Sequence, residues 1–220
     1  MASFFNLTLD TTAPAGLTLK LNNGAAYATS TSVTATIGLT DSVTTGYQMK
    51  IWGVAGAATE AEAAWATFVK SKAITLTTGD GQKTVSIKVR DDVGNETATV
   101  TAKITLDTAV PVVTITGPDK SKISKVATFN VSAFSFSANV DFEEYKIKVV
   151  PSESSLENAG TQIPITVGST NTSGTAGGYK ADTAINVTIN GADLETASAG
   201  DGVKIVKVFV KNAAGTWSVA

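Results

Sequence analysis

The sequence predicts an all-β protein made of two tandem β-sandwich domains, and three observations support this. Segments rich in threonine and valine alternate polar and apolar residues along the 220-residue chain, which is typical of half-buried strands. Clusters of glycine, asparagine and aspartate separate these segments and predict turns. The phrase Leu9-Asp10-Thr11 returns as Leu106-Asp107-Thr108, after roughly 97 residues, about the length of one small β domain.

The first domain is expected at residues 10–107, after an N-terminal arm at residues 1–9. Its alternating segments are residues 17–21, 33–39, 47–51, 85–89 and 98–106. In the fourth segment, Val85, Ile87 and Val89 share the face predicted to point inward.

Residues 57–70 interrupt this pattern because they are rich in alanine. Ala61, Trp65 and Phe68 lie at helical spacing, so we expect a short helix or helical turn that covers one edge of the sandwich. Trp65 has two interpretations, a residue of a binding pocket or a packing anchor, and the pattern favours the anchor.

The second domain is expected at residues 108–220 and repeats the plan of the first. Its inward-facing segments are predicted at residues 129–133, 145–149 and 206–210. It also carries an insertion around residues 151–180, in which the low-complexity stretch 168–178 is predicted to be a surface loop.

Composition limits the chemistry that the chain can perform. A hydrophobic content of 43% with 16% charged residues is typical of a globular protein that buries a core in each domain. The chain has no cysteine and no histidine, which excludes disulfides, thiolate sites and histidine-based catalysis. The net charge is −2 and the lysines are scattered, so we expect no nucleic-acid partner. No apolar run is long enough to suggest a membrane partner.

A block of turn and strand residues in the first domain resembles a known repeat family. Residues 79–95 read GDGQKTVSIKVRDDVGN, and together with the two Leu-Asp-Thr phrases they are similar to a bacterial immunoglobulin-like repeat. Such repeats occur in tandem in bacterial surface proteins and bacteriophage structural proteins. The resemblance covers residues 9–108 and is weaker in the second domain, where Asn212 stands in place of the family's aspartate. It implies immunoglobulin-like sandwiches that act as spacer, decoration or adhesion modules, without catalytic or cofactor-binding residues.

The strands of the two domains do not match in number. In the first domain, the turn at Gly94-Asn95 precedes the full segment 97–106, whereas in the second only residues 216–220 follow the turn at Ala214-Gly215. The arm instead carries one strand pattern more than the first domain needs. In it, Phe5, Leu7 and Leu9 alternate up to the first Leu-Asp-Thr phrase, as the residues of a strand would. An incomplete sandwich leaves a sheet edge unpaired, which is unfavourable unless something covers it.

Two interpretations of the arm remain open. In the first, residues 3–9 add as a strand to a sheet of another subunit or of a neighbouring virion protein. Ile205 and Phe209 are then expected to point outward and to extend the contact surface. In the second, residues 3–9 are a free tail or pair within their own domain, and Trp217 closes the second domain alone. The predicted interface set is Phe4, Phe5, Leu7, Leu9, Ile205, Phe209 and Trp217.

Acidic residues offer two weaker candidate sites. Asp10, Asp41, Asp91 and Asp92 are expected at one end of the first domain, where carboxylates either bind calcium or cap turns; we favour caps and predict no metal or cofactor. The equivalent end of the second domain offers Asp107, Asp141 and Asn212. The glutamates 143, 144, 153 and 157 match the residue type of a glycoside-hydrolysing pair, but a solvated strand edge explains them better.

The sequence therefore favours a non-enzymatic structural or decoration protein of a bacteriophage virion, in its head, tail or fibre. The first residues lack the pattern of a secretion signal, so incorporation into a particle is the expected route to the outside. Expected partners are other virion proteins or copies of the chain itself. The alternative is an adhesion or glycan-binding module of a bacterial cell surface. A third interpretation, an accessory domain of a polysaccharide-degrading enzyme, requires a separate catalytic domain.

Overall fold

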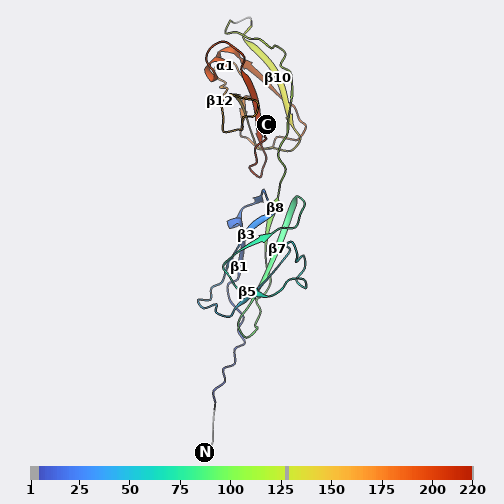
Figure 1. The fold of residues 1–220 in the computed structure, drawn as a ribbon, viewed down its shortest axis with the longest axis vertical. Helices are drawn as coiled ribbons and strands as arrows, with labels where there is room; N and C mark the ends of the chain where they lie inside the picture. Colours follow the sequence, from blue (N-terminus) through green and yellow to red (C-terminus); the bar gives the residue numbers. More distant parts are fainter. Residues whose placement is uncertain (1–4, 127–128, 220) are drawn as a thin grey trace, which may run out of the picture. The chain divides into compact units, whose positions relative to one another are not determined.

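A computed structural model of the chain describes residues 5–126 and 129–219 (Figure 1). The chain divides into two compact units, Met1–Thr108 (unit 1) and Ala109–Ala220 (unit 2). Each unit consists of two β-sheets that enclose one apolar core. The predicted all-β fold of two tandem immunoglobulin-like sandwiches is confirmed.

Unit 1 has a three-stranded and a five-stranded sheet. In the first sheet, β3 (Ser32–Gly38) lies between β1 (Thr18–Leu21) and β6 (Ser71–Thr75). A short 3₁₀ turn, η1 (Asn22–Gly24), follows β1. The second sheet has the order β2-β8-β7-β4-β5, and its strands are β2 (Tyr27–Ala28), β4 (Gln48–Trp52), β5 (Ala66–Thr67), β7 (Gly81–Arg90) and β8 (Val100–Leu106).

The core of unit 1 forms where the inward faces of these sheets meet. Val85, Ile87 and Val89 of β7 are fully buried, as the alternation predicts, and they face Leu21 of β1 and Ile37 of β3 across the same cluster. Burial of each such side chain stabilises the fold by about 1.5–3 kcal/mol.

The alanine-rich segment forms no helix. Its central part is a hydrogen-bonded turn at residues 59–63, in which the Glu62 carboxylate accepts bonds from the backbone N–H groups of Ala58 and Thr59. The segment then continues as β5, an edge strand paired with β4. Phe68 enters the core, whereas Trp65 is half-buried and stacks on the Arg90 guanidinium, 4.4 Å from the ring centroid. The helical prediction is wrong beyond this turn because pairing with β4 satisfies the backbone instead.

Unit 2 pairs a three-stranded sheet with a sheet centred on one long strand. In the first, β10 (Val131–Ala138) lies between β9 (Val113–Thr116) and β14 (Ile185–Asn190). In the second, β11 (Glu144–Val150) pairs with β15 (Ile205–Lys211) on one side. On its other side it pairs with two short strands, β12 (Thr161–Gln162) and β13 (Ser173–Gly174). One helix, α1 (Gly191–Ala197), follows β14.

Aromatic side chains dominate the core of unit 2. Phe136, Phe142 and Tyr145 are buried together, and the Phe142 ring stacks on Tyr179 at 4.9 Å between centroids. The inward face of β11 is the predicted one, and Val206, Val208 and Val210 of β15 face the same core.

The sequence predicts the wrong inward face for β10. Phe134, Phe136 and Ala138 point into the core, not Val131 and Ala133, and Phe129 is 63% exposed before the strand begins. A shift of one residue exchanges the two faces of a strand. The observed register is favoured because burial of two phenylalanine rings removes more apolar area from water than burial of the smaller side chains.

The insertion around residues 151–180 contains ordered structure. The low-complexity stretch, predicted to be a surface loop, contributes β13, and Thr172 is fully buried with its hydroxyl donating to the Ile163 carbonyl oxygen at 2.8 Å. Residues 152–157 are tied to the outward face of β11 and β15. Lys148 Nζ donates to the Glu157 carbonyl oxygen at 2.6 Å, and Lys207 Nζ donates to the Ser155 carbonyl oxygen at 2.7 Å.

Candidate functional site: an exposed arm and an open sheet edge

The described part of the N-terminal arm, residues 5–9, lies outside the sandwich of unit 1 (Figure 1). Phe5, Leu7 and Leu9 are 85%, 86% and 85% exposed, and the described residues before β1 form no strand or helix (Figure 1). Phe4, the remaining predicted interface residue of the arm, falls outside the described residues. Three apolar side chains at alternating positions are therefore presented to solvent on an unpaired backbone.

Strand β15 has one open side. It pairs with β11 along its whole length, but on its other side contact begins only at its end, where the Ser218 N–H donates to the Val210 carbonyl oxygen at 2.8 Å. The backbone N–H and C=O groups of successive strand residues point to alternate edges of the strand. Those of Val206 and Val208 therefore point to the same edge as those of Val210, away from β11. No strand within residues 5–126 and 129–219 pairs with that side at residues 205–208.

Unit 1 has the same turn followed by a complete strand. After β7, the Thr97 N–H donates to the Val89 carbonyl oxygen at 2.8 Å, as Ser218 does to Val210 in unit 2. The turns also match, because the Asp91 carboxylate accepts from the Asn95 N–H and the Asn212 side-chain oxygen accepts from the Thr216 N–H, both at 2.8 Å. In unit 1 the chain then continues as β8, which pairs with β7 from Ile87↔Val100 to Gly81↔Leu106.

The remaining predicted interface residues lie on the outward face of β15. Phe209 is on that face as predicted, but its exposed fraction is 0% because the protein itself covers it. Lys207 lies over its ring at 5.2 Å and is tied to residues 153 and 155. Ile205 is half-buried. The expectation that Phe209 presents apolar surface to a partner is therefore not met.

Trp217 packs on the same face between two lysines. The ammonium groups of Lys146 and Lys211 lie 4.8 and 5.2 Å from its ring centroid. Lys146 also pairs with Glu157 at 2.6 Å, and Lys211 pairs with Glu144. The hydrogen bond from Lys211 lowers the pKa of Glu144 against the opposing effect of desolvation. Two of the glutamates considered for catalysis, Glu144 on β11 and Glu157 in the loop after β11, are thus engaged in ion pairs.

Of the aspartates at the end of unit 1, Asp10 and Asp91 cap turns, as the sequence favours, whereas Asp41 bonds to a backbone N–H 26 residues away. Asp10 accepts from the Thr12 N–H at 2.9 Å, and Asp41 accepts from the Ala15 N–H at 3.2 Å. Desolvation alone would raise the pKa of Asp91, but the bonds donated by Asn95 and Val93 outweigh it and lower the pKa. Within the described residues, no three acidic side chains gather in an arrangement that suits a metal ion.

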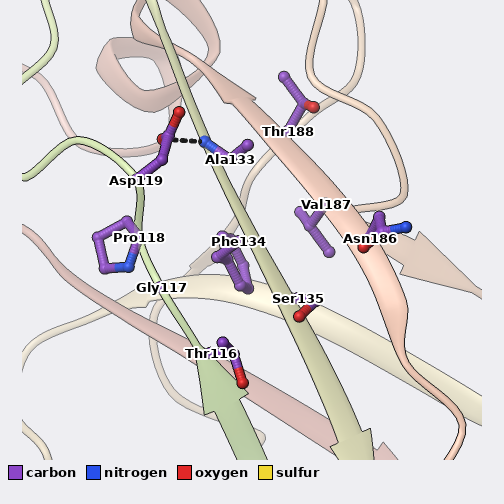
Figure 2. Close-up of a pocket in the computed structure, with 10 residues that line it drawn as sticks. All are labelled: Thr116, Gly117, Pro118, Asp119, Ala133, Phe134, Ser135, Asn186, Val187 and Thr188. Carbon is purple, nitrogen blue, oxygen red and sulfur yellow. Dashed lines mark hydrogen bonds between the residues drawn. The ribbon is translucent and has the colours of Figure 1, made fainter.

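A shallow hollow of about 380 Å³ lies on the sheet of β9, β10 and β14 (Figure 2). One wall is the turn after β9, where the Asp119 carboxylate accepts from the Ala133 N–H at 2.7 Å and from the Ser132 hydroxyl at 3.1 Å. The bond from Ala133 is the main cause of a lowered pKa for Asp119. Ser135 and Thr188 add hydroxyl groups to the lining, so the hollow can offer both hydrogen-bond donors and acceptors.

Sequence reasoning missed the most buried acidic group of unit 2, Asp193 in the first turn of α1. Its exposed fraction is 0%. Its carboxylate accepts from the Thr166 hydroxyl at 2.9 Å and from the Val167 and Ser169 N–H groups at 3.3 and 3.1 Å. This carboxylate holds part of the insertion against the helix. The sequence carries no local sign of this role, because Thr166 and Ser169 are more than twenty residues away.

No protein-family model and no curated protein matches the sequence. Among solved structures, the chain is similar to fibronectin(III)-like modules of Clostridium thermocellum CbhA, with a TM-score of 0.48, 9% identity and coverage of 92% of this chain and 90% of that chain. It is also similar to part of a chitinase from Bacillus thuringiensis, with a TM-score of 0.31, 15% identity and coverage of 92% and 30%.

Part of the dimeric latent PorU of Porphyromonas gingivalis is a further match, with a TM-score of 0.30, 12% identity and coverage of 97% and 20%. The chain therefore spans less than a third of the chitinase and of PorU. The pairing of strands and the two buried cores define the chain as a tandem β-sandwich protein. Within the described residues, no helix is both long and apolar enough to span a bilayer.

Proposed function

We propose that this protein is a non-enzymatic structural or decoration protein of a bacteriophage virion. Its two sandwich units are displayed on the particle surface, and it assembles through sheet-edge contacts with other virion proteins or with copies of itself. The observation that carries the proposal is the combination of an exposed apolar arm with an unpaired edge at β15. Such features promote unspecific aggregation unless a partner occupies them.

The engagement of the charged groups supports a structural role. Asp91, Asp193 and Glu144 all hold turns, loops or strands together through bonds within their own unit. Lys146 and Lys211 serve the same purpose on the outer face of unit 2. These groups stabilise the sandwiches and are positioned for packing, whereas catalysis requires groups directed at a substrate.

The hollow on unit 2 favours the alternative, an adhesion or glycan-binding module of a bacterial surface protein. Its lining offers the Asp119 carboxylate and the hydroxyls of Ser135 and Thr188, groups that hydrogen-bond to sugar hydroxyls. Pro118 lies on the same wall and adds an apolar surface (Figure 2).

Electron microscopy of purified particles with gold-labelled antibodies against this protein tests the proposal. We expect label on the particle surface and peptides of the protein in the mass spectrum of the same preparation. Absence of both from particles of the phage that encodes the chain would overturn the proposal. A glycan array tests the alternative, which predicts binding that is lost in Ser135→Ala and Thr188→Ala variants.

A further inference from the structure

The open side of β15 corresponds to the position that β8 occupies in unit 1. The turns that follow β7 and β15 have equivalent hydrogen bonds, so Val89 corresponds to Val210, and Gly81 corresponds to Gly202. In unit 1 this side of the sheet is filled over seven residue pairs, from Gly81↔Leu106 to Ile87↔Val100. In unit 2 the corresponding side of residues 202–208 is unpaired within the described chain. Val203, near the start of this stretch and before β15, is 97% exposed.

The arm repeats the sequence of the strand that fills this position in unit 1. Leu9-Asp10-Thr11 corresponds to Leu106-Asp107-Thr108, so Leu7 corresponds to Ile104 and Phe5 to Ala102. In β8, Ile104 and Leu106 are buried in the core, whereas their counterparts in the arm are exposed. The arm thus has the alternation of a core strand but no sheet of its own.

A side-chain contact fixes the register of β8 and has a counterpart in the arm. Asp80 Oδ1 accepts from the Thr108 N–H at 3.0 Å and from the Thr108 hydroxyl at 2.9 Å. Asp201 follows Gly200 in unit 2 as Asp80 follows Gly79 in unit 1, and Thr11 corresponds to Thr108. Both halves of the contact are therefore present in the chain, one on the arm and one beside the open edge.

Unit 2 also exposes apolar groups in the segment that holds the sequence position of β2. In unit 1, β2 lies between β1 and β3 in the sequence and pairs with the far side of β8, which buries Ala28. In unit 2, Val126 and Phe129 fall between β9 and β10, and both are exposed. These apolar groups therefore remain exposed in unit 2 at the sequence position where unit 1 forms β2.

We propose that the arm of one copy adds as an antiparallel strand to the open side of β15 in a second copy. The pairing of β7 with β8 sets the register. Phe5 lies opposite Val206 of β15, and Leu7 and Leu9 extend the pairing to Lys204 and Gly202, which precede β15. Thr11 is bonded to Asp201. Backbone bonds supply affinity, and the alternating apolar side chains supply specificity. The arm and the edge are different surfaces, so the contact is heterologous and propagates from head to tail into a ring or filament. This inference rests on the proposed assembly function and names its partner as a second copy of the chain.

The first test measures the mass of the full chain by sedimentation over a range of concentrations. We expect mass to rise with concentration, and we expect this rise to be lost in a variant lacking residues 2–9, because the described residues of this segment, 5–9, are exposed and belong to neither core. Adding a peptide of residues 2–11 to this variant should slow hydrogen exchange at Val206 and Val208. A peptide carrying Leu7→Asp and Leu9→Asp is the matched control and should have no effect. Association that persists without the arm would overturn the proposal.

The second test uses disulfide trapping, which is unambiguous because the chain has no cysteine. The proposed register places Asn6 directly opposite Ile205 on the outward face, so an Asn6→Cys chain mixed with an Ile205→Cys chain should form a mixed disulfide. The control pairs Asn6→Cys with Val206→Cys, whose side chain points to the other face, and should cross-link much less. Equal cross-linking, or a disulfide that forms only within a chain carrying both cysteines, would overturn the inference.

If particles contain the protein but neither test shows self-association, the proposed virion role stands and only this inference fails.

Discussion

At the scale of single residues, the buried carboxylate of Asp193 illustrates how unit 2 orders its insertion. Helix α1 begins after Asn190, whose side-chain oxygen accepts from the Ala192 N–H at 2.9 Å. Asp193 then lies in the first turn, where the helix dipole favours a negative charge. Its bonds to Thr166, Val167 and Ser169 join a segment distant in sequence to the helix.

We predict that Asp193→Ala destabilises unit 2 by about 2–4 kcal/mol, because it leaves buried donors without an acceptor. Urea denaturation followed by fluorescence measures this change in the free energy of unfolding. Glu153→Ala is the matched control, since Glu153 is exposed, and it should change stability little. A loss that is the same in both variants would show that the carboxylate does not hold the insertion.

The pKa of the same group predicts how stability depends on pH. Burial would raise the pKa of Asp193, but the hydrogen bonds from Ser169, Thr166 and Val167 outweigh it and lower the pKa. A carboxyl group with a lowered pKa in the folded state stabilises above its unfolded value, and this contribution is lost as pH falls through the folded pKa. We expect the stability advantage of the wild type over Asp193→Asn to shrink as pH falls below about 4. Urea midpoints of both proteins across this range measure it, and a constant difference would contradict the expectation.

At the scale of elements, β15 has a different environment on each of its faces and edges. Its inward face contributes Val208 and Val210 to the core, and its outward face carries the fully buried Phe209 next to Lys207, which is bonded to residue 155 of the insertion. Pairing with β11 satisfies one edge, while the other remains open at residues 205–208. An apolar residue on the outward face of a strand, such as Phe209, therefore does not by itself indicate an interface with a partner. The same protein can bury such a residue where an insertion follows the neighbouring strand, here β11.

Phe209→Ala should destabilise unit 2 by about 3–5 kcal/mol, because it removes a fully buried ring and leaves a cavity. Phe129→Ala is the matched control, since Phe129 is 63% exposed, and should cost less than about 1 kcal/mol. Thermal unfolding of the two variants measures the difference. If Phe209→Ala leaves stability unchanged, the insertion does not cover this ring in solution.

At the scale of the whole molecule, each unit has a core of its own. The buried cluster of unit 1 contains residues from β1 to β8 only, and that of unit 2 contains residues from β10 onward. We predict that residues 10–108 expressed alone fold and unfold cooperatively, because every strand that lines the first core is included. Circular dichroism and urea unfolding test this. A non-cooperative transition would show that unit 1 needs residues outside this range.

How far the sequence predicts this structure depends on the range of the interactions concerned. Alternation correctly predicts the inward faces of β7, β11 and β15, because the two-residue period of a strand is a local property. It gives the wrong face for β10, where Val131 and Ala133 compete with Phe134 and Phe136, and it predicts a helix where β5 forms. These errors arise where two local patterns are both plausible and pairing with a distant strand decides between them.

The sequence by itself determines the all-β class, the two tandem sandwiches and the apolar alternation of Phe5, Leu7 and Leu9, because these follow from periodicity and turn chemistry along the chain. Only the tertiary structure decides that the insertion is bonded to Lys207 beside the buried Phe209, that Asp193 is buried, and that Val206 and Val208 present an unpaired backbone within the described residues. These features depend on contacts between residues far apart in sequence, and the geometry of such contacts is set by packing, which no local pattern encodes.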